Sequence, residues 1–521
     1  MSETEKLLQE SLQQNTELLK RQNEFIKEIK QLNEQVAYLT NKLYGRHSEK
    51  IVNPNQMSLL DNSFTDPEQT GKQSEKISEN EAQKVRKRHR TRSEIISKEL
   101  PIEETIIMRE KDCCEHGHQL VSVGKHFIRQ VVHQIPGKLF VENIYEQTYK
   151  CIACENLDGC SHLYHGKAPQ ALIAHSIATP SLMAEILNQK YVLGTPLYRQ
   201  LKEWQRAGIL LSETTISNWV IKCAAIIKPL YELLHQKLIG QRFLQGDETP
   251  YEVLREPNKP ASSKSYIWLI RSISRSNEPI VYYAYADTRS GKFAQKVYQK
   301  FTGILQCDGY AGYNLLGDSI TRIGCWAHVR RKFYDDANKV HGHFKETRPL
   351  AILNEMFYLE KKWQKFSSNE RLEVRLKKLK PLIDKFWQWC DQAETLPKSR
   401  LGKALTYAQN QRTALNQILN FGEIDLSNNA SERNMKSYVI GRKNWLFSTS
   451  PNGAEANAIW MSLIESAKAN GLTPFNYLQD IMAKISQLPA FVKNKDLEAY
   501  LPWNWQDESR TATHSRIAAE K

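Results

Sequence analysis

The sequence predicts a multidomain α+β protein in which helical segments flank one strand-rich core. Three observations indicate this class: an apolar heptad repeat near the amino terminus, apolar strands alternating with turns over 240–310, and helical periodicity over 170–225, 327–420 and 428–487. The chain has 521 residues, more than the ~250–300 residues over which a single core grows. We therefore expect several domains, beginning with an N-terminal coiled-coil helix and a small zinc-binding β module, and ending in a helical C-terminus.

Residues 1–45 carry the heptad repeat. From Phe25 to Leu43 the apolar residues alternate spacings of four and three, which makes a seam for another helix. Asn15 falls at a core position of the repeat, where it would fix the register. The pattern predicts a leucine zipper that forms a homodimer or a higher oligomer. The alternative is an amphipathic helix that packs on its own chain.

Residues 46–99 are polar and interrupted by Pro and Gly, which is typical of a flexible linker. Its end is strongly basic between Lys84 and Arg92, and the whole chain has a formal charge of +14. Such clusters release counterions when they contact DNA. A solvated linker is the alternative. The side chains predicted to contact DNA here are Arg86, Lys87, Arg88 and Arg90.

Residues 100–165 contain short apolar alternations and two Cys/His pairs at zinc-ligand spacing. Cys113 and His116 form one pair, and Cys151 and Cys154 form the other. Two such pairs can surround one tetrahedral Zn²⁺, so we predict a structural zinc finger. Alternative ligands remain open, namely Cys114, His118, Cys160 and His162.

The amino terminus is polar and acidic, without the apolar stretch of a signal peptide. The sequence contains no run of ~18 apolar residues, so it predicts no membrane span. The nine cysteines suit metal binding better than a disulfide framework. We therefore expect a cytoplasmic protein.

Residues 166–235 predict a helix-turn-helix-like DNA-binding region. Thr195 and Pro196 are typical of a helix start, Gly208 of a turn, and Ser212 of the cap of a second helix. Helices joined by a short Gly-containing turn place their second member in the major groove of DNA in many proteins. Many helix pairs with this spacing never touch DNA.

Three carboxylates stand in contexts that suit catalysis. Asp247 and Asp308 follow apolar strands, and Glu432 lies in a helix expected to start near Asn428. In an RNase H-like sheet, a carboxylate on the central first strand faces a second one on the adjacent fourth strand, and a later helix supplies the third. Three such acids can hold two Mg²⁺ ions, which drive phosphodiester chemistry. Glu248 is the alternative to Asp247 as the catalytic acid of this strand. Strand alternation lets only one of the two face the site, and we favour Asp247.

Basic and aromatic residues accompany Glu432 along the predicted helix. They suggest contacts to DNA phosphates or to an unpaired base, although Trp445 also suits a core position. Cys325 and His328 form a second Cys-x-x-His spacing, for which packing or hydrogen bonding is favoured over metal binding because no second pair stands near it. The residues predicted to contact DNA here are Arg433, Lys436, Arg442, Lys443 and Trp445.

Long motifs in order along nearly the whole chain resemble the transposases of the insertion-sequence-66 family. They begin at 43–50, 246–250, 306–314 and 324–328 and continue at 428–433, 440–447, 462–472 and 501–505. The resemblance implies a DDE transposase with an RNase H-like core at 236–335 and 421–487, a helical insertion at 336–420 and a C-terminal tail at 488–521. The sequence differs from relatives at three places. His116 stands where they usually have Cys, Ser427 stands where many have Asp, and the loop at 451–454 is often richer in Gly and Arg in relatives.

By the same resemblance, Asp247, Asp308 and Glu432 are the catalytic ligands of Mg²⁺ or Mn²⁺. The family implies binding to terminal inverted repeats and target DNA, strand cleavage and strand transfer in a bacterial nucleoid, beside accessory proteins of the same element. The alternatives are a decayed transposase that only binds DNA and an RNase H-like nuclease. All three acids are present, which favours the active enzyme.

Overall fold

The computed structural model describes residues 17, 18, 21, 22, 24, 25, 29, 140–144, 148–150, 163–165, 170–340, 347–489 and 492–507. The chain divides into two compact units, one formed by Met1–Gly45 with Asn143–Lys521 and the other by Arg46–Glu142. The elements below belong to the first unit. Two sets of predicted site residues lie outside the described residues: the zinc ligands Cys113, His116, Cys151 and Cys154, and the basic residues Arg86, Lys87, Arg88 and Arg90.

The described residues of the predicted zipper are helical, and they include apolar seam positions. Leu18 and Phe25 are 61% and 63% exposed, and Ile29 is exposed as well. Exposed apolar side chains at heptad spacing are what a partner helix covers. Pairing through this helix stays a prediction.

Two short strands lie in the segment predicted to hold zinc. β1 (Thr148–Lys150) pairs antiparallel with β2 (Leu163–His165). The expectation of short strands is confirmed here.

The predicted helix pair is present, and it forms part of a larger helical region. Its elements are α4 (Pro180–Leu187), the π-helical turn η2 (Asn188–Val192), α5 (Leu197–Arg206) and α6 (Glu213–Ile239). Ser212 caps α6 by accepting a hydrogen bond from the backbone N–H of Thr215 at 3.1 Å. Gly208 turns the chain with a φ of 90°, which favours glycine. α5 starts later than expected, with Pro196 itself in the cap position.

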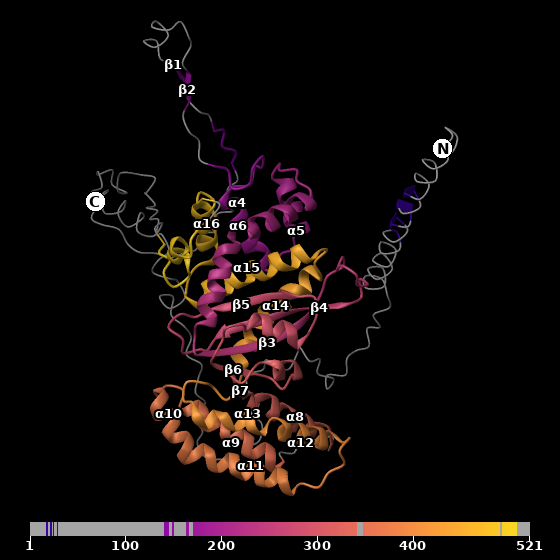
Figure 1. The fold of residues 1–521 in the computed structure, drawn as a ribbon, viewed down its shortest axis with the longest axis vertical. Helices are drawn as coiled ribbons and strands as arrows, with labels where there is room; N and C mark the ends of the chain where they lie inside the picture. Colours follow the sequence, from indigo (N-terminus) through magenta and orange to yellow (C-terminus); the bar gives the residue numbers. More distant parts are fainter. Residues whose placement is uncertain are drawn as a thin grey trace, which may run out of the picture. The chain divides into compact units, whose positions relative to one another are not determined.

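One five-stranded mixed sheet forms the centre of the described unit (Figure 1). The strand order is β5-β4-β3-β6-β7; β3, β4 and β5 pair antiparallel, and β6 and β7 run parallel to β3. β7 was not predicted from the sequence. The strands are β3 (Phe243–Glu252), β4 (Lys264–Ser272), β5 (Val281–Ala286), β6 (Ile304–Cys307) and β7 (Thr321–Gly324).

The expectation that β3 would end at Gln245 is wrong. β4 pairs with β3 from Leu244 through Glu252, and this continuous ladder keeps the strand extended. Asp247 therefore lies within the strand rather than just beyond it, whereas Asp308 directly follows β6.

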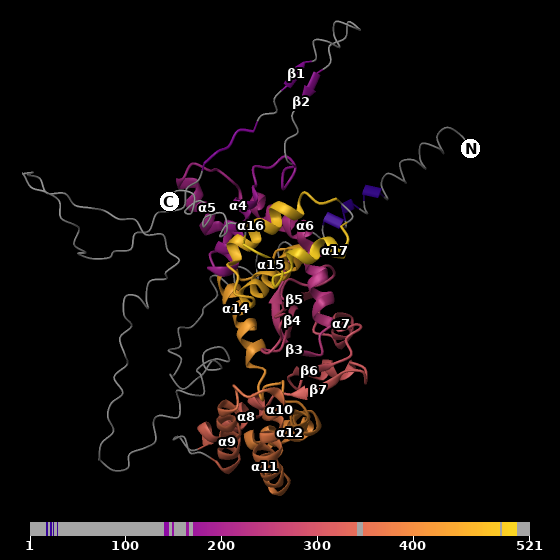
Figure 2. The ribbon, with the colours of Figure 1, turned by 90° about the vertical axis from the view of Figure 1, so that its left-hand side faces the viewer.

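Helices cover both sides of the sheet. Figure 2 shows α14 (Asn429–Trp445) and α7 (Gly291–Val297) on opposite sides of it. α15 (Pro451–Ala469) packs along the edge strand β5, where the Ser462 and Ser466 hydroxyls accept hydrogen bonds from strand N–H groups at 2.8 and 3.0 Å. These bonds satisfy backbone groups that an open edge leaves unpaired. The C-terminal helices are α16 (Pro474–Ile485), α17 (Asn494–Leu497) and the 3₁₀ turn η6 (Glu498–Tyr500).

The chain between β7 and α14 forms a helical group with its own buried core (Figure 1). Trp326, Phe386 and Trp387 pack against one another at the centre of this core. No helix in the described ranges has the length and apolarity needed to cross a lipid bilayer. The elements are α8 (Trp326–Val340), α9 (Arg348–Lys362), α10 (Ser368–Val374), the π-helical turn η4 (Arg375–Leu379), α11 (Lys380–Gln392), α12 (Arg400–Asn410), α13 (Arg412–Asn416) and the 3₁₀ turn η5 (Gln417–Asn420).

Candidate active site

The pairing of β3 with β6 sets Asp247 beside Asp308. The parallel register aligns Gln245 with Gln306, and each aspartate follows two residues later. Burial, together with the negative charges of Glu248, Asp308 and Glu432, raises the pKa of Asp247 to about 8. Each nearby carboxylate disfavours ionisation of its neighbour, so these acids add to the larger effect of burial on Asp247.

The start of α14 brings Glu432 to the same place. Asn428 precedes the helix, and its side-chain Nδ2 donates to the Gly246 carbonyl oxygen at 2.9 Å. Its backbone N–H donates to Cys325 Sγ at 3.2 Å. These two contacts hold the first turn of α14 against β3, next to Asp247.

Glu432 has cationic partners that leave part of its carboxylate unused. Arg331 Nη2 lies 3.2 Å from Oε2, and His328 Nε2 lies 3.7 Å from Oε1. Among the described residues, Glu432 Oε1 accepts no hydrogen bond although it is buried. Burial disfavours the imidazolium, yet Cys325, Glu432 and Asp308 raise the pKa of His328 to about 9. His328 therefore lies beside the acids, in an electrostatic rather than a purely packing role.

The donor set suits a hard divalent cation. Carboxylate oxygens are the ligands that Mg²⁺ prefers, and the raised pKa of Asp247 reflects burial first and neighbouring negative charge second. In the described part of the chain, no group of three or more His, Cys, Asp or Glu side chains is placed so that it could hold a metal ion. Metal binding by these acids therefore stays a prediction.

Glu248 lies on the other side of β3 from Asp247, as strand alternation requires. Tyr313 donates to its Oε2 at 2.7 Å, and Arg289 Nε donates to its Oε1 at 3.0 Å. A Cβ at Gly246, on this same side, would collide with the Tyr298 hydroxyl. Glu248 is thus held by neutral and basic partners, although burial and the charge of Asp308 raise its pKa as well.

Hydrogen-bonded glutamine side chains connect β3 and β6 two residues before Asp247 and Asp308. Gln245 Nε2 donates to Gln306 Oε1 at 2.7 Å, and Gln306 Nε2 donates to the Asp425 carbonyl oxygen at 2.7 Å. The Asp425 carboxylate accepts from Arg371 Nη2 at 2.7 Å. This chain links the helical insertion to the two strands that carry Asp247 and Asp308.

The side chains predicted to contact DNA from α14 differ in their surroundings. Arg433 and Lys443 are exposed, and Lys436 is half-buried. Arg442 donates to the Pro250 carbonyl oxygen, and Trp445 packs edge-on against Tyr191 with 5.6 Å between ring centroids. The last two thus make contacts within the fold, and their predicted contacts to DNA stay a prediction.

Sequence reasoning missed several residues of this site. Gln245 and Gln306 each stand two residues before an aspartate, so a repeated Gln-x-Asp pattern was the available signal. Arg331 follows His328 by three residues on α8, a spacing that puts both on one helix face. No local pattern pointed to Asn428 as the link to Gly246.

Comparisons with known proteins agree on one family. Residues 175–456 match the family model described as "Transposase IS66 family", residues 31–105 match "Transposase C of IS166 homeodomain", and residues 462–503 match "IS66 C-terminal element".

Two relatives come from Sinorhizobium fredii, and both are described as uncharacterized. Protein y4jD is 30% identical over 96% of this chain and 98% of its own length. Protein y4hP is 28% identical over 76% of this chain and 73% of its own length. No solved structure matches the chain.

Proposed function

We propose, since this chain belongs to the transposase family of insertion sequence 66, that it cleaves DNA at the ends of its element and joins those ends to target DNA. The catalytic acids in this proposal are Asp247, Asp308 and Glu432. The single observation that carries it is that β3 pairs with β6 and bonds to Asn428 at the start of α14, which brings the elements that carry the three acids side by side.

The sheet supports an RNase H-like core. Asp247 lies on the central strand β3, which is the first strand of the sheet along the chain. Asp308 follows β6, the fourth strand and the neighbour of β3, and Glu432 comes from the later helix α14. The helical insertion separates the second acid from the third.

Two Mg²⁺ ions, or Mn²⁺, would activate a water or a 3′-hydroxyl and stabilise the leaving oxygen when bound by these acids. The backbone N–H of Glu248 donates to Asp247 Oδ1 at 2.9 Å, and that of Tyr310 donates to Asp308 Oδ1 at 2.9 Å. These bonds orient one oxygen of each carboxylate and leave the other oxygen for a cation. In this proposal Glu432 would exchange its partner Arg331 for a cation, and Arg331 would then contact a DNA phosphate.

In cleavage, a water oxygen attacks the scissile phosphorus and the 3′-oxygen on the element side leaves with a proton. In strand transfer, that 3′-hydroxyl attacks a target phosphodiester and the target 3′-oxygen leaves. Asp247, Asp308 and Glu432 hold the reacting groups in line in both steps.

The remaining parts of the chain would recognise DNA and assemble the complex. In this proposal the zipper pairs two chains, the basic linker and the α5–α6 pair grip the terminal inverted repeats, and Cys113, His116, Cys151 and Cys154 hold a structural Zn²⁺. A cytoplasmic, nucleoid-bound protein fits this role. Arg433 and Lys443 on α14 are placed to bind backbone phosphates near the acids.

The first test compares Asp308→Ala with Asp318→Ala on duplexes that carry the ends of the encoding element. Asp318 is an exposed acid ten residues further along the chain, so it serves as the matched control. We expect Asp308→Ala to bind the ends with unchanged affinity and to give no Mg²⁺-dependent cleavage, while Asp318→Ala cleaves normally. Equal cleavage by Asp308→Ala and the wild type would remove Asp308 from the centre. A wild-type chain that binds the ends but never cuts would favour the DNA-binding alternative.

The second test measures metal binding without activity. Mg²⁺ should raise the thermal midpoint of the wild-type protein, because a ligand that binds only the folded state stabilises it. Asp247→Asn should abolish this rise. A rise of the same size in Asp247→Asn would place the bound ion elsewhere.

A further inference from the structure

A cavity of about 620 Å³ with a mixed polar and apolar lining begins at Gly309, the residue after Asp308. We propose that it receives one unpaired nucleobase from the DNA strand next to the scissile phosphate. This inference rests on the proposed function for the position of that phosphate. The cavity volume falls within the range of small-molecule sites in proteins.

The cavity is formed where the sheet meets the helical insertion. Gly309 and Ala311 line it from the segment that follows Asp308, Thr321 and Arg322 line it from β7, and Ala414 lines it from α13. Arg322 Nη2 also lies 3.5 Å from the Asp308 carbonyl oxygen, so the cavity wall is continuous with the candidate active site.

Gly309 keeps this wall close to the insertion. A Cβ at this position would stand 2.8 Å from Tyr407 Cε2 and 3.1 Å from the Gln411 amide carbon. A larger residue would therefore push α12 and α13 away from the segment after Asp308 and widen the cavity.

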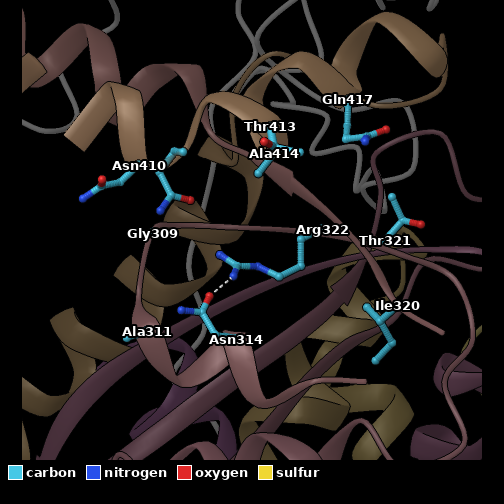
Figure 3. A pocket seen from close by; sticks show the side chains of 11 residues that line it. Gly309, Ala311, Asn314, Ile320, Thr321, Arg322, Asn410, Thr413, Ala414 and Gln417 are labelled. Carbon is cyan, nitrogen blue, oxygen red and sulfur yellow. Dashed lines mark hydrogen bonds between the residues drawn. The ribbon is translucent and has the colours of Figure 1, made fainter. Parts of the chain in front are cut away.

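The polar lining matches the edge of a base. Primary amides bring both donors and acceptors, and a guanidinium brings donors only. Figure 3 shows Arg322 extending toward Asn314, whose Oδ1 accepts its hydrogen bond. This bond leaves the Asn314 amide N–H₂ pointing away from Arg322. The polar side chains of the lining are Asn314, Thr321, Arg322, Asn410, Gln411, Thr413 and Gln417.

Two features favour a base over a phosphate. A phosphate is recognised by donors alone, usually by several cations, and Arg322 is the single cationic residue that lines the cavity in the described part of the chain. Ala311, Ile320 and Ala414 add apolar surface that can contact the face of a ring.

A base stacked in a duplex cannot enter such a cavity. The nucleotide must leave the stack, which costs a few kcal/mol and is least costly at an unpaired or distorted position. Capture of the base would hold the neighbouring phosphate at Asp308. It would also give the helical insertion a role in substrate positioning.

The test uses 2-aminopurine, whose fluorescence rises when it unstacks. It is placed in turn at each position flanking the cleavage site of an end duplex, and the full-length protein is added without divalent metal. We expect one position to brighten with the wild type. Ala414→Trp, which fills the cavity, should bind the duplex but abolish that signal, whereas Thr406→Trp on the exposed face of α12 should keep it.

The second arm adds Mg²⁺ and a duplex that lacks the base at the responding position. Ala414→Trp should slow cleavage of the normal duplex by about 10²-fold, the size of effect expected for a misplaced substrate. The abasic duplex should restore its rate. Asn314→Ala, which keeps the fold but loses an amide, should weaken the fluorescence signal in the same direction.

The outcomes separate this inference from the proposed function. A signal that survives Ala414→Trp, or no brightening at any position while the duplex is bound, would overturn the cavity assignment even if cleavage proceeds. A brightening that Ala414→Trp removes would support it even if the wild type never cleaves. In that case only the catalytic proposal would fall.

Discussion

Glu360 and Glu432 are both buried glutamates that pair with arginine. They differ in how many hydrogen bonds the carboxylate and its arginine partners make. Glu360 Oε1 accepts from Arg371 Nε at 2.6 Å, and its Oε2 accepts from Arg375 Nε at 3.1 Å. Both arginines are almost completely buried. Their remaining N–H groups donate to backbone carbonyl oxygens of Ile418, Phe421, Gly422 and Ile424.

Glu432, by contrast, has a partly exposed arginine and a distant histidine. Arg331 is 38% exposed, His328 lies 3.7 Å away, and Oε1 accepts no hydrogen bond from the described residues. A fully satisfied ionic cluster rigidifies a core, while an incompletely satisfied one can exchange partners. The comparison teaches that the Glu360 cluster joins the insertion to the segment before α14, whereas the ion pairs of Glu432 leave one buried carboxylate oxygen without a hydrogen bond from the described residues.

The largest expected effect is on activity at Glu432. Glu432→Gln should lower the cleavage rate by about 10⁴-fold, the loss typical of removing a central catalytic group. The free energy of unfolding of this variant should differ from that of the wild type by less than ~1 kcal/mol, because the Glu432 carboxylate makes few hydrogen bonds. Gel-based cleavage assays and urea titrations measure the two quantities. Destabilisation as large as that of Glu360→Gln would erase the contrast between the two glutamates.

Glu360→Gln should mainly affect stability. Removing one charge from a buried ionic cluster leaves the others uncompensated and costs about 3–5 kcal/mol. Urea unfolding followed by tryptophan fluorescence reports this, since Trp326 and Trp387 lie in the same core. Glu355→Gln, at an exposed position of the same helix, is the control and should be near neutral. Similar midpoints for the two variants would contradict a structural role for Glu360.

A smaller effect is expected where the two regions are connected. Gln306→Leu leaves Gln245 Nε2 and the Asp425 carbonyl oxygen without their partner, at a cost of about 1–3 kcal/mol. The aspartates should also be less well oriented, so Mg²⁺ affinity should fall by about 10-fold. Calorimetric Mg²⁺ titration of this variant and of exposed Gln299→Leu would show it. Unchanged Mg²⁺ affinity would mean that the amide chain supports the fold alone.

The smallest effect is expected for an ion pair on the surface of the insertion. Lys380 and Asp384 lie 2.9 Å apart but are 52% and 60% exposed. Lys380→Ala should change the free energy of unfolding by less than ~0.5 kcal/mol, since solvent screens such pairs. A loss of unfolding free energy as large as that of Glu360→Gln would show that burial does not explain the difference between the exposed and the buried ion pair.

Local features of the fold were predictable from the sequence. The cap at Ser212, the turn at Gly208 and the start of α14 depend on side chains and backbone groups a few residues apart. β7 was missed because four residues carry too little periodicity, and β3 was predicted too short because Thr249 and Pro250 resemble a turn. Pairing with β4 overrode that local preference.

The sequence by itself determined the order of the acids, the presence of a strand at each of the two aspartates, and the helix that carries Glu432. Only the tertiary structure decided that Arg331 pairs with Glu432, that Gln245 and Gln306 bond to each other, and that Asn428 bonds to Gly246 across 182 residues of chain. Periodicity and capping are encoded over a few residues. Contacts between distant segments depend on how the whole core packs, which no short pattern contains.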